Sequence, residues 1–321
     1  MASGPTLPIS GGTDMVAVTP GDQILPADFN NARTNINTIL SAPTSKTDLR
    51  GLNQGGVSVG QAVTGTTIEA LGSAGAFTEL QNEIQAINTF YTATTNVHIQ
   101  TDIVAGDIIE ANEWNGIMYD TKARWDNPTK DEATSTKTYP VEDTWDVSVD
   151  GNWTGTLTST VTFTWPTKED LWTFFNAGGA VGMEGAIVGY SGSEPQTLAW
   201  ETRLNNLGDV YIVKSDTVSG AGTNAGLGQV DLTTSYQVIN TYAGSVTYTN
   251  DWANVEVQAN DNTNPTSITV KMTFRDGDSQ PTDEPVEGDT RMRGVLRTPN
   301  PAGSGFSFVS PSASQTAIVE T

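Results

Sequence analysis

The period of the hydrophobic pattern changes near Lys137, and this change most constrains the fold. Before it, apolar residues recur at three- and four-residue steps, as on one face of a helix. After it, segments such as 156–165 alternate apolar with polar residues, as half-buried strands do. We therefore expect an α+β fold. A helical and extended assembly segment occupies 1–135, a β-rich sandwich-like domain with two short helices occupies 136–298, and a Pro/Gly/Ser-rich tail follows at 299–321.

A short module occurs twice in the first segment, 85 residues apart. The copies Gly21 to Asn30 and Gly106 to Asn115 agree in order at Gly, Asp, Ile, an acid, an aromatic residue and Asn. Gly-Asp is typical of a turn, and the apolar spacing that follows predicts the start of an amphipathic helix. A duplicated docking element suggests assembly. The alternative is two unrelated helix starts with similar turn chemistry.

Three helical stripes are expected before residue 135. One follows each copy of the module, and the third, from Phe77 to Tyr91, has the spacing of a two-heptad seam. Helices this short are marginal without partners, so the seam packs either against its own chain or against another subunit. We expect the following residues to serve in assembly or docking: Phe29, Ile36, Phe77, Leu80, Ile84, Ile87, Tyr91, Trp114, Asn115 and Trp125.

The second half combines strands with two helices. The first helix is expected between Pro166 and Gly179, with a proline and acids at its start and glycine at its end. The second is expected from Gln196 to Leu207, with Leu198, Leu204 and Leu207 facing inward and Gly208 as its stop. Alternation and β-branched residues predict the strands 143–149, 156–165, 210–213, 235–238, 245–249, 255–257, 267–274 and 291–297.

Charge and composition restrict the partners. The net charge is -22, from 37 acidic and 15 basic residues, and such a field repels phosphate backbones. We expect no nucleic-acid partner, and no membrane insertion because no run of about 18 apolar residues occurs. The N-terminus lacks the basic patch and apolar core of a secretory signal. The absence of cysteine removes disulfides and thiolate chemistry.

The sequence offers few catalytic groups. The single histidine, His98, reads as a surface or packing residue, and the glycine-dense stretch 220–228 reads as a flexible loop. Paired carboxylates could cleave glycans, but the strand-turn repeat of a β-helix depolymerase is missing. We expect no enzyme activity and no cofactor. Calcium is the one metal considered, with Asp276, Asp278 and Asp283 as candidate ligands, against the alternative of a solvated turn.

Most of the tryptophans lie in the second half. Aromatic side chains at such density build β-sandwich cores and subunit interfaces, and they also form platforms for sugars. The second reading makes the β-rich half a glycan-recognising module. The residues concerned are Trp145, Trp153, Trp165, Trp172, Trp200 and Trp252.

Two motifs carry a resemblance to a known class of protein. The second module copy, ending Glu113-Trp114-Asn115, and the run from Trp165 to Gly179 with its Phe-Phe-Asn-Ala-Gly-Gly end resemble structural proteins of tailed-bacteriophage virions, of the marine and cyanophage type. The first copy departs from the pattern, with Phe29 in place of tryptophan and a proline inside. The two module copies and the run from Trp165 to Gly179 together cover about a ninth of the chain.

The resemblance implies a non-enzymatic virion component, tail-, neck- or fibre-associated, that is made in the host cytoplasm. Its expected partners are further copies of itself, in a symmetric homo-oligomer, and other virion proteins. The alternative is an adhesin whose C-terminal domain binds a host-surface glycan or receptor. A depolymerase is a weaker third reading.

Overall fold

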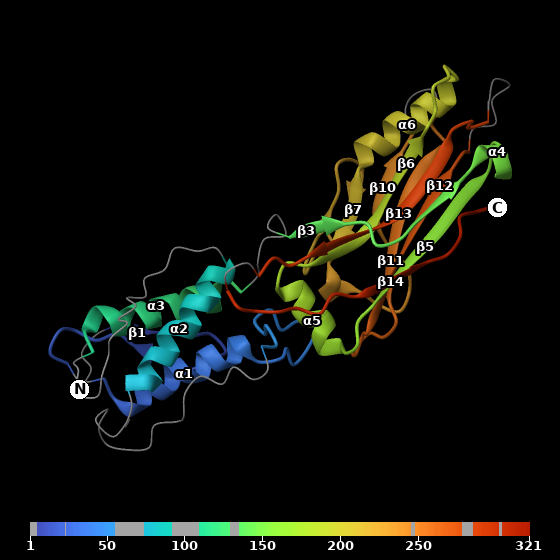
Figure 1. Ribbon diagram of the computed structural model, residues 1–321. Coiled ribbons are helices and arrows are strands. Elements are labelled where there is room, and N and C mark those ends of the chain that lie inside the picture. The colour runs from blue at the N-terminus through green and yellow to red at the C-terminus, as the bar shows by residue number, and fades with distance from the viewer. Residues whose placement is uncertain are drawn as a thin grey trace. The chain divides into compact units, whose positions relative to one another are not determined.

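The chain has an α+β fold with a β-sandwich-like part, as expected (Figure 1). The computed structural model describes residues 5–22, 24–54, 74–91, 109–128, 135–244, 248–277, 285–301 and 304–321. They form two compact units. The helical unit lies within 1–44, 48–130 and 300–308, and the β-rich unit lies within 45–47, 131–299 and 309–321.

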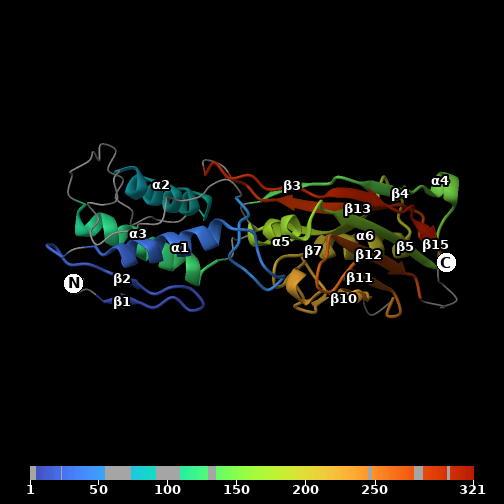
Figure 2. The ribbon, with the colours of Figure 1, turned by 90° about the horizontal axis from the view of Figure 1, so that it is seen from below.

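The helical unit contains three helices that lie side by side (Figures 1 and 2). They are α1 (Pro26–Leu40), α2 (Ala74–Tyr91) and α3 (Ala111–Asp126). An antiparallel pair of two-residue strands, β1 (Thr6–Leu7) and β2 (Met15–Val16), precedes them. Each of the three apolar patterns predicted to be helical is therefore a helix in the structure.

Two antiparallel sheets make up the β-rich unit. The six-stranded sheet has the order β3-β13-β6-β7-β8, and β4 also pairs with β13. Its strands are β3 (Thr136–Thr138), β4 (Glu142–Trp145), β6 (Ala180–Val188), β7 (Asp209–Ile212), β8 (Thr217–Val218) and β13 (Asp289–Thr298).

The seven-stranded sheet has the order β14-β5-β12-β11-β10-β9, and β15 also pairs with β5. Its strands are β5 (Thr156–Thr164), β9 (Thr223–Asn224), β10 (Gln237–Ala243), β11 (Trp252–Ala259), β12 (Ser267–Arg275), β14 (Ser312–Gln315) and β15 (Val319–Glu320). Buried and more exposed residues alternate along β5, β11 and much of β12, as a sheet with one covered face requires.

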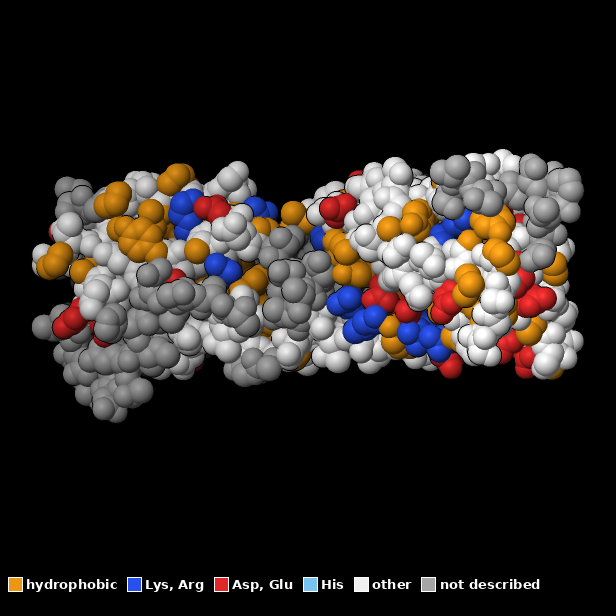
Figure 3. All heavy atoms as spheres, turned by 90° about the horizontal axis from the view of Figure 1, so that it is seen from above, with side chains coloured by type: hydrophobic (Ala, Val, Ile, Leu, Met, Phe, Trp, Pro, Cys, Tyr) orange, Lys and Arg blue, Asp and Glu red, His pale blue; other side chains and the backbone are white. Residues whose placement is uncertain are grey.

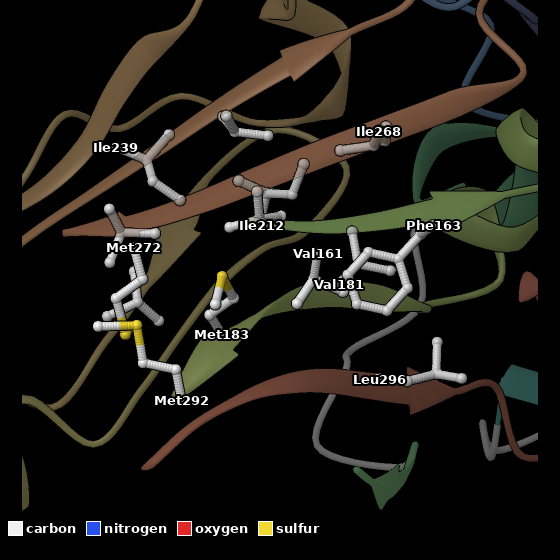
Figure 4. Packing of buried hydrophobic residues seen from close by; sticks show 14 of the residues in the cluster. Val161, Phe163, Val181, Met183, Ile212, Ile239, Ile268, Met272, Met292 and Leu296 are labelled. Atoms are coloured by element: carbon white, nitrogen blue, oxygen red, sulfur yellow. The ribbon is translucent and has the colours of Figure 1, made fainter. Parts of the chain in front are cut away.

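The two sheets face each other across one hydrophobic core (Figure 4). Val161 and Met272 extend from the seven-stranded sheet, and Met183, Ile212 and Met292 from the six-stranded sheet. All five side chains are fully buried. The interdigitation of two apolar sheet faces is what stabilises this unit.

Two helices add aromatic side chains to the same core. Helix α5 (Lys168–Asn176) contributes Phe174 and Phe175, and α6 (Pro195–Leu207) contributes Trp200. The predicted stop at Gly208 is present, with φ 61°, a backbone conformation that favours glycine. Leu198, expected to face inward, is instead 40% exposed.

Two predicted segments differ from the structure. The strand expected over 143–149 ends at Trp145, and a short helix, α4 (Val147–Asp150), follows. The side chain of Asp146 accepts the Ser148 N–H and begins that helix, which leaves Val149 78% exposed. Within the strand expected at 245–249, residues 245–247 lie outside the described residues and the rest is a turn.

The structure also differs from the separate C-terminal tail expected from residue 299, because these residues are divided between the two units. Residues 300–308 belong to the helical unit, and 309–321 belong to the β-rich unit. There β14 and β15 both pair with β5. Ser312, Ala313 and Ser314 supply backbone hydrogen bonds, so a composition typical of loops does not exclude a strand.

Candidate functional site

Both copies of the repeated module begin a helix in the same way. Leu25 and Glu110, the residues before α1 and α3, have nearly identical extended backbones, with φ/ψ of -81°/151° and -76°/151°. In each, the backbone N–H donates to the acid three residues on: Leu25 to Asp28 at 3.2 Å, and Glu110 to Glu113 at 2.7 Å. Burial raises the pKa of the Asp28 carboxyl, and the bond from Leu25 offsets this only in part. Gln23 and residues 101–108 lie outside the described residues.

The aromatic residues of the two copies stack on each other. The ring centroids of Phe29 and Trp114 are 6.5 Å apart with an interplanar angle of 19°. Both side chains are buried, at 1% and 0% exposure. Because each lies in the first turn of its helix, the starts of α1 and α3 meet at this contact.

The residues expected to dock on another subunit are already buried within the helical unit. Of the two alternatives left open by the sequence, packing against the same chain is the one seen here, because α1, α2 and α3 cover one another. Eight of the ten are at most 2% exposed: Phe29, Ile36, Phe77, Leu80, Ile84, Ile87, Trp114 and Trp125. The other two, Tyr91 and Asn115, are partly buried.

Asn115 has a specific internal partner. Its Oδ1 accepts the Val18 N–H at 2.9 Å, and its Nδ2 donates to the Val18 carbonyl at 2.9 Å. On α1 the matching pair of bonds comes from Asn35, to the N–H and carbonyl of Thr13, at 3.0 and 2.7 Å. The two asparagines hold the N-terminal segment as a neighbouring strand would. Asn115 was among the predicted docking residues because it belongs to the repeated module, whereas nothing in the sequence marked Asn35 as a functional residue.

The indoles of the same stripe hold the segment too. Trp114 Nε1 donates to the Val16 carbonyl at 3.3 Å, and Trp125 Nε1 donates to the Ser10 carbonyl at 2.8 Å. Burial raises the pKa of Tyr91, whose hydroxyl donates to the Pro128 carbonyl at 2.6 Å. In this conformation the predicted docking set is a packed core with satisfied polar atoms.

Among the described residues, no group of three or more His, Asp or Glu side chains gathers in a way that could hold a metal ion. Asp276 is 7% exposed and accepts the Gln196 Nε2 amide at 2.7 Å. Asp278, Asp283 and His98 lie outside the described residues. Asp276 is thus engaged by a helix of its own chain.

A polar cavity of about 410 Å³ lies beside the β10–β11 hairpin in the β-rich unit. Its lining includes Thr241 and Thr249, Asp251 and Trp252, Asn254, and Arg275 from the end of β12. The size falls within the range of about 300–1,000 Å³ typical of small-molecule sites. None of these residues belongs to the predicted docking or metal set, although Trp252 was among the tryptophans considered as sugar platforms.

Asp251 is among the residues that line the cavity and is fully buried. Its Oδ1 accepts the Gly277 N–H at 3.0 Å, and its Oδ2 lies 3.4 Å from Arg203 Nη1. The Arg203 guanidinium also lies 4.2 Å from the ring centroid of Trp200. Burial lowers the pKa of Arg203, and the Asp251 carboxylate opposes this change. Arg203 and Asp251 therefore form a buried ion pair whose charges offset each other.

The wall of the cavity combines an aromatic ring, a cation and an amide. Trp252 is partly buried, and its Cα partners on the neighbouring strands are Ala243 and Arg275. Arg275 is exposed and forms no ion pair in the part of the chain that the structure describes. Asn254 Oδ1 is buried with no hydrogen-bond donor among the described residues. A ligand hydroxyl could supply that donor.

Most of the other tryptophans belong to the core. Trp153, Trp165, Trp172 and Trp200 are at most 2% exposed, and Trp145 packs against the same cluster. The core interpretation is therefore correct for these five. Trp252 alone of the six lines the cavity.

Several charged side chains on the six-stranded sheet form ion pairs. Arg293 Nε lies 2.6 Å from Glu184, and Asp209 accepts from both Lys137 and Arg297. Burial alone would raise the pKa of Glu184, but the hydrogen bond and charge of Arg293 outweigh it, and the pKa is lowered. Figure 3 shows basic and acidic side chains next to one another on one face of the molecule.

No described helix is both long enough and apolar enough to cross a membrane. Comparison of the sequence with protein-family models gives no match, and comparisons with curated proteins and with solved structures give none either.

Proposed function

We propose that this chain is a non-enzymatic structural protein of a tailed-bacteriophage virion, tail-, neck- or fibre-associated, made in the host cytoplasm and assembled as a symmetric homo-oligomer. The helical unit joins the particle or sister subunits, and the β-rich unit faces outward. The partners are further copies of the chain and other virion proteins.

The observation that carries the proposal is the module pair. Two copies of one sequence begin α1 and α3 with the same backbone and meet at Phe29 and Trp114. The second copy and the run from Trp165 to Gly179 also carry the resemblance to virion proteins. Because the apolar stripes are buried within the helical unit, this unit is already folded before assembly and docks through its outer surface. Preorganisation of this kind lowers the entropic cost of assembly.

The first test is the solution mass of the full-length protein by light scattering at several concentrations. A discrete closed oligomer, such as a trimer or hexamer, supports the proposal. A monomer at every concentration contradicts the homo-oligomer. The second test is mass spectrometry of particles purified from the source that encodes the chain, in which peptides of this chain are expected at many copies per particle.

A second candidate function is recognition of a host-surface glycan by the β-rich unit. The open polar cavity beside Trp252 favours it, because sugar sites combine an aromatic face with a few polar groups. A glycan array probed with the full-length protein tests this candidate. A purely structural protein should bind no glycan selectively.

A further inference from the structure

We infer that the cavity beside the β10–β11 hairpin binds an acidic saccharide, with the sugar carboxylate on Arg275 and a sugar face on Trp252. The inference rests on the second candidate function, glycan recognition, and adds the class of sugar. It does not depend on any role proposed for the helical unit.

The charge argument begins with Arg275. Three other arginines of the β-rich unit lie beside carboxylates: Arg203 by Asp251, Arg293 by Glu184, and Arg297 by Asp209. Arg275 is exposed at a cavity wall and has no such partner among the described residues. A guanidinium binds a carboxylate through two parallel N–H···O bonds, which favours a carboxylate-bearing ligand over a neutral one.

The aromatic surface lies beside this cation. Trp252 and Arg275 are Cα partners on β11 and β12, and residues paired in this way lie about 5 Å apart on one face of a sheet. Ala243, on the other side of Trp252, is small. One sugar ring can therefore contact the indole while its carboxylate reaches the guanidinium.

The amide of Asn254 supplies hydroxyl recognition. It is two residues from Trp252 on β11, so both side chains lie on the same face of the strand. Its Oδ1 is buried and has no donor among the described residues, and it lines the cavity. Thr241, its Cα partner on β10, adds a hydroxyl to the lining. A saccharide hydroxyl satisfies the Asn254 acceptor.

The carboxylate in the cavity lining is compatible with a bound anion. Asp251 is the carboxylate in the lining, and its charge is offset by Arg203 and by the Gly277 N–H. These contacts hold the Asp251 carboxylate in place before any ligand arrives, so little ordering of this group is needed on binding.

The test is calorimetric titration of the full-length protein with N-acetylneuraminic acid and glucuronic acid, and with the neutral sugars galactose and N-acetylglucosamine. The acidic sugars are expected to bind at least about 10-fold more tightly than the neutral ones, as a charge-assisted bidentate contact allows. Arg275→Gln should remove that preference. Arg291→Gln is the matched control, because Arg291 lies on β13, is partly exposed and is absent from the cavity lining.

Each outcome has a distinct meaning. Binding of acidic sugars that is lost in Arg275→Gln and kept in Arg291→Gln supports the inference. Equal binding of neutral and acidic sugars, unchanged in Arg275→Gln, overturns the acidic class while glycan recognition stands. Binding of no sugar by the folded wild-type protein overturns both. Asn254→Ala should weaken all sugars about equally, and circular dichroism of each variant establishes that it is folded.

Discussion

Phe29 and Trp114 stack on each other, and they occupy the same position in two copies of one module that are 85 residues apart in the chain. The two copies of the repeated module are therefore in contact with each other. The two copies of the module form their interface within a single chain. Without the repeat, the same contact would require two subunits.

The stacked pair should be energetically coupled. Phe29→Ala and Trp114→Ala are each expected to lower the free energy of unfolding by about 3–5 kcal/mol, because both side chains are buried and leave cavities. The double variant should show a coupling of about 0.5–1.5 kcal/mol, measured by urea denaturation. Tyr119→Ala, at a 42% exposed position on α3, is the control and should change stability by less than about 0.5 kcal/mol. Additive losses at positions 29 and 114 would contradict the contact.

Asn115 should protect the Val18 amide from exchange. In Asn115→Ala both bonds to the Val18 backbone are lost, so hydrogen exchange at Val18 is expected to accelerate by about 10-fold or more. The free energy of unfolding should fall by about 1–3 kcal/mol, because the backbone groups lose their partners. Asn254→Ala removes an amide from the β-rich unit and should leave Val18 exchange unchanged. Slow exchange in Asn115→Ala would mean that another group protects this amide.

The buried pair of Arg203 and Asp251 should tolerate joint replacement better than single replacement. Asp251→Asn removes the carboxylate that is paired with the buried guanidinium and is expected to cost about 3–5 kcal/mol of unfolding free energy. Arg203→Met combined with Asp251→Leu removes both charges and should recover much of that loss. Chemical denaturation of the two variants makes the comparison. A single variant as stable as the double one would refute the pairing.

The pair of Glu184 and Arg293 should make stability depend on pH in the acidic range. Because the pKa of Glu184 is lowered in the folded protein, its contribution is fully present above the unfolded pKa of about 4.3 and is lost as the pH falls through the folded value. The difference in unfolding free energy between wild type and Glu184→Gln should be constant above about pH 5.5 and should shrink below about pH 4. Urea denaturation from pH 3 to 7 measures it. A difference that stays constant to pH 3 would show that the carboxylate gains nothing from Arg293.

Several elements could be predicted because their signals are local. The spacing of Phe29 and Ile36 predicted α1, and both residues are buried in it. The alternation in 156–165 predicted β5, and the proline and acids after Trp165 predicted the start of α5. In each case the period of the apolar residues and the capping groups lie within a few residues of one another.

Other features could not be predicted, because they depend on contacts between residues that are distant in the sequence. Val147 and Val149 continued an alternating pattern, but the Val147 N–H donates to Asp289, far along the chain, and a helix forms there instead. The candidate site likewise could not be read from spacing. Trp252 and Arg275 become neighbours only when β11 pairs with β12.

The sequence by itself determined the helical and strand-forming segments and the module repeat, because the period of apolar residues fixes which face of an element loses water. It did not determine what covers that face, because hydrophobic burial is non-directional and a second subunit would serve as well as the same chain. The tertiary structure decided that the stripes of α1, α2 and α3 cover one another. It also decided that Asn115 holds Val18, and that Arg275 lines a cavity beside Trp252, since these contacts join residues distant in the sequence.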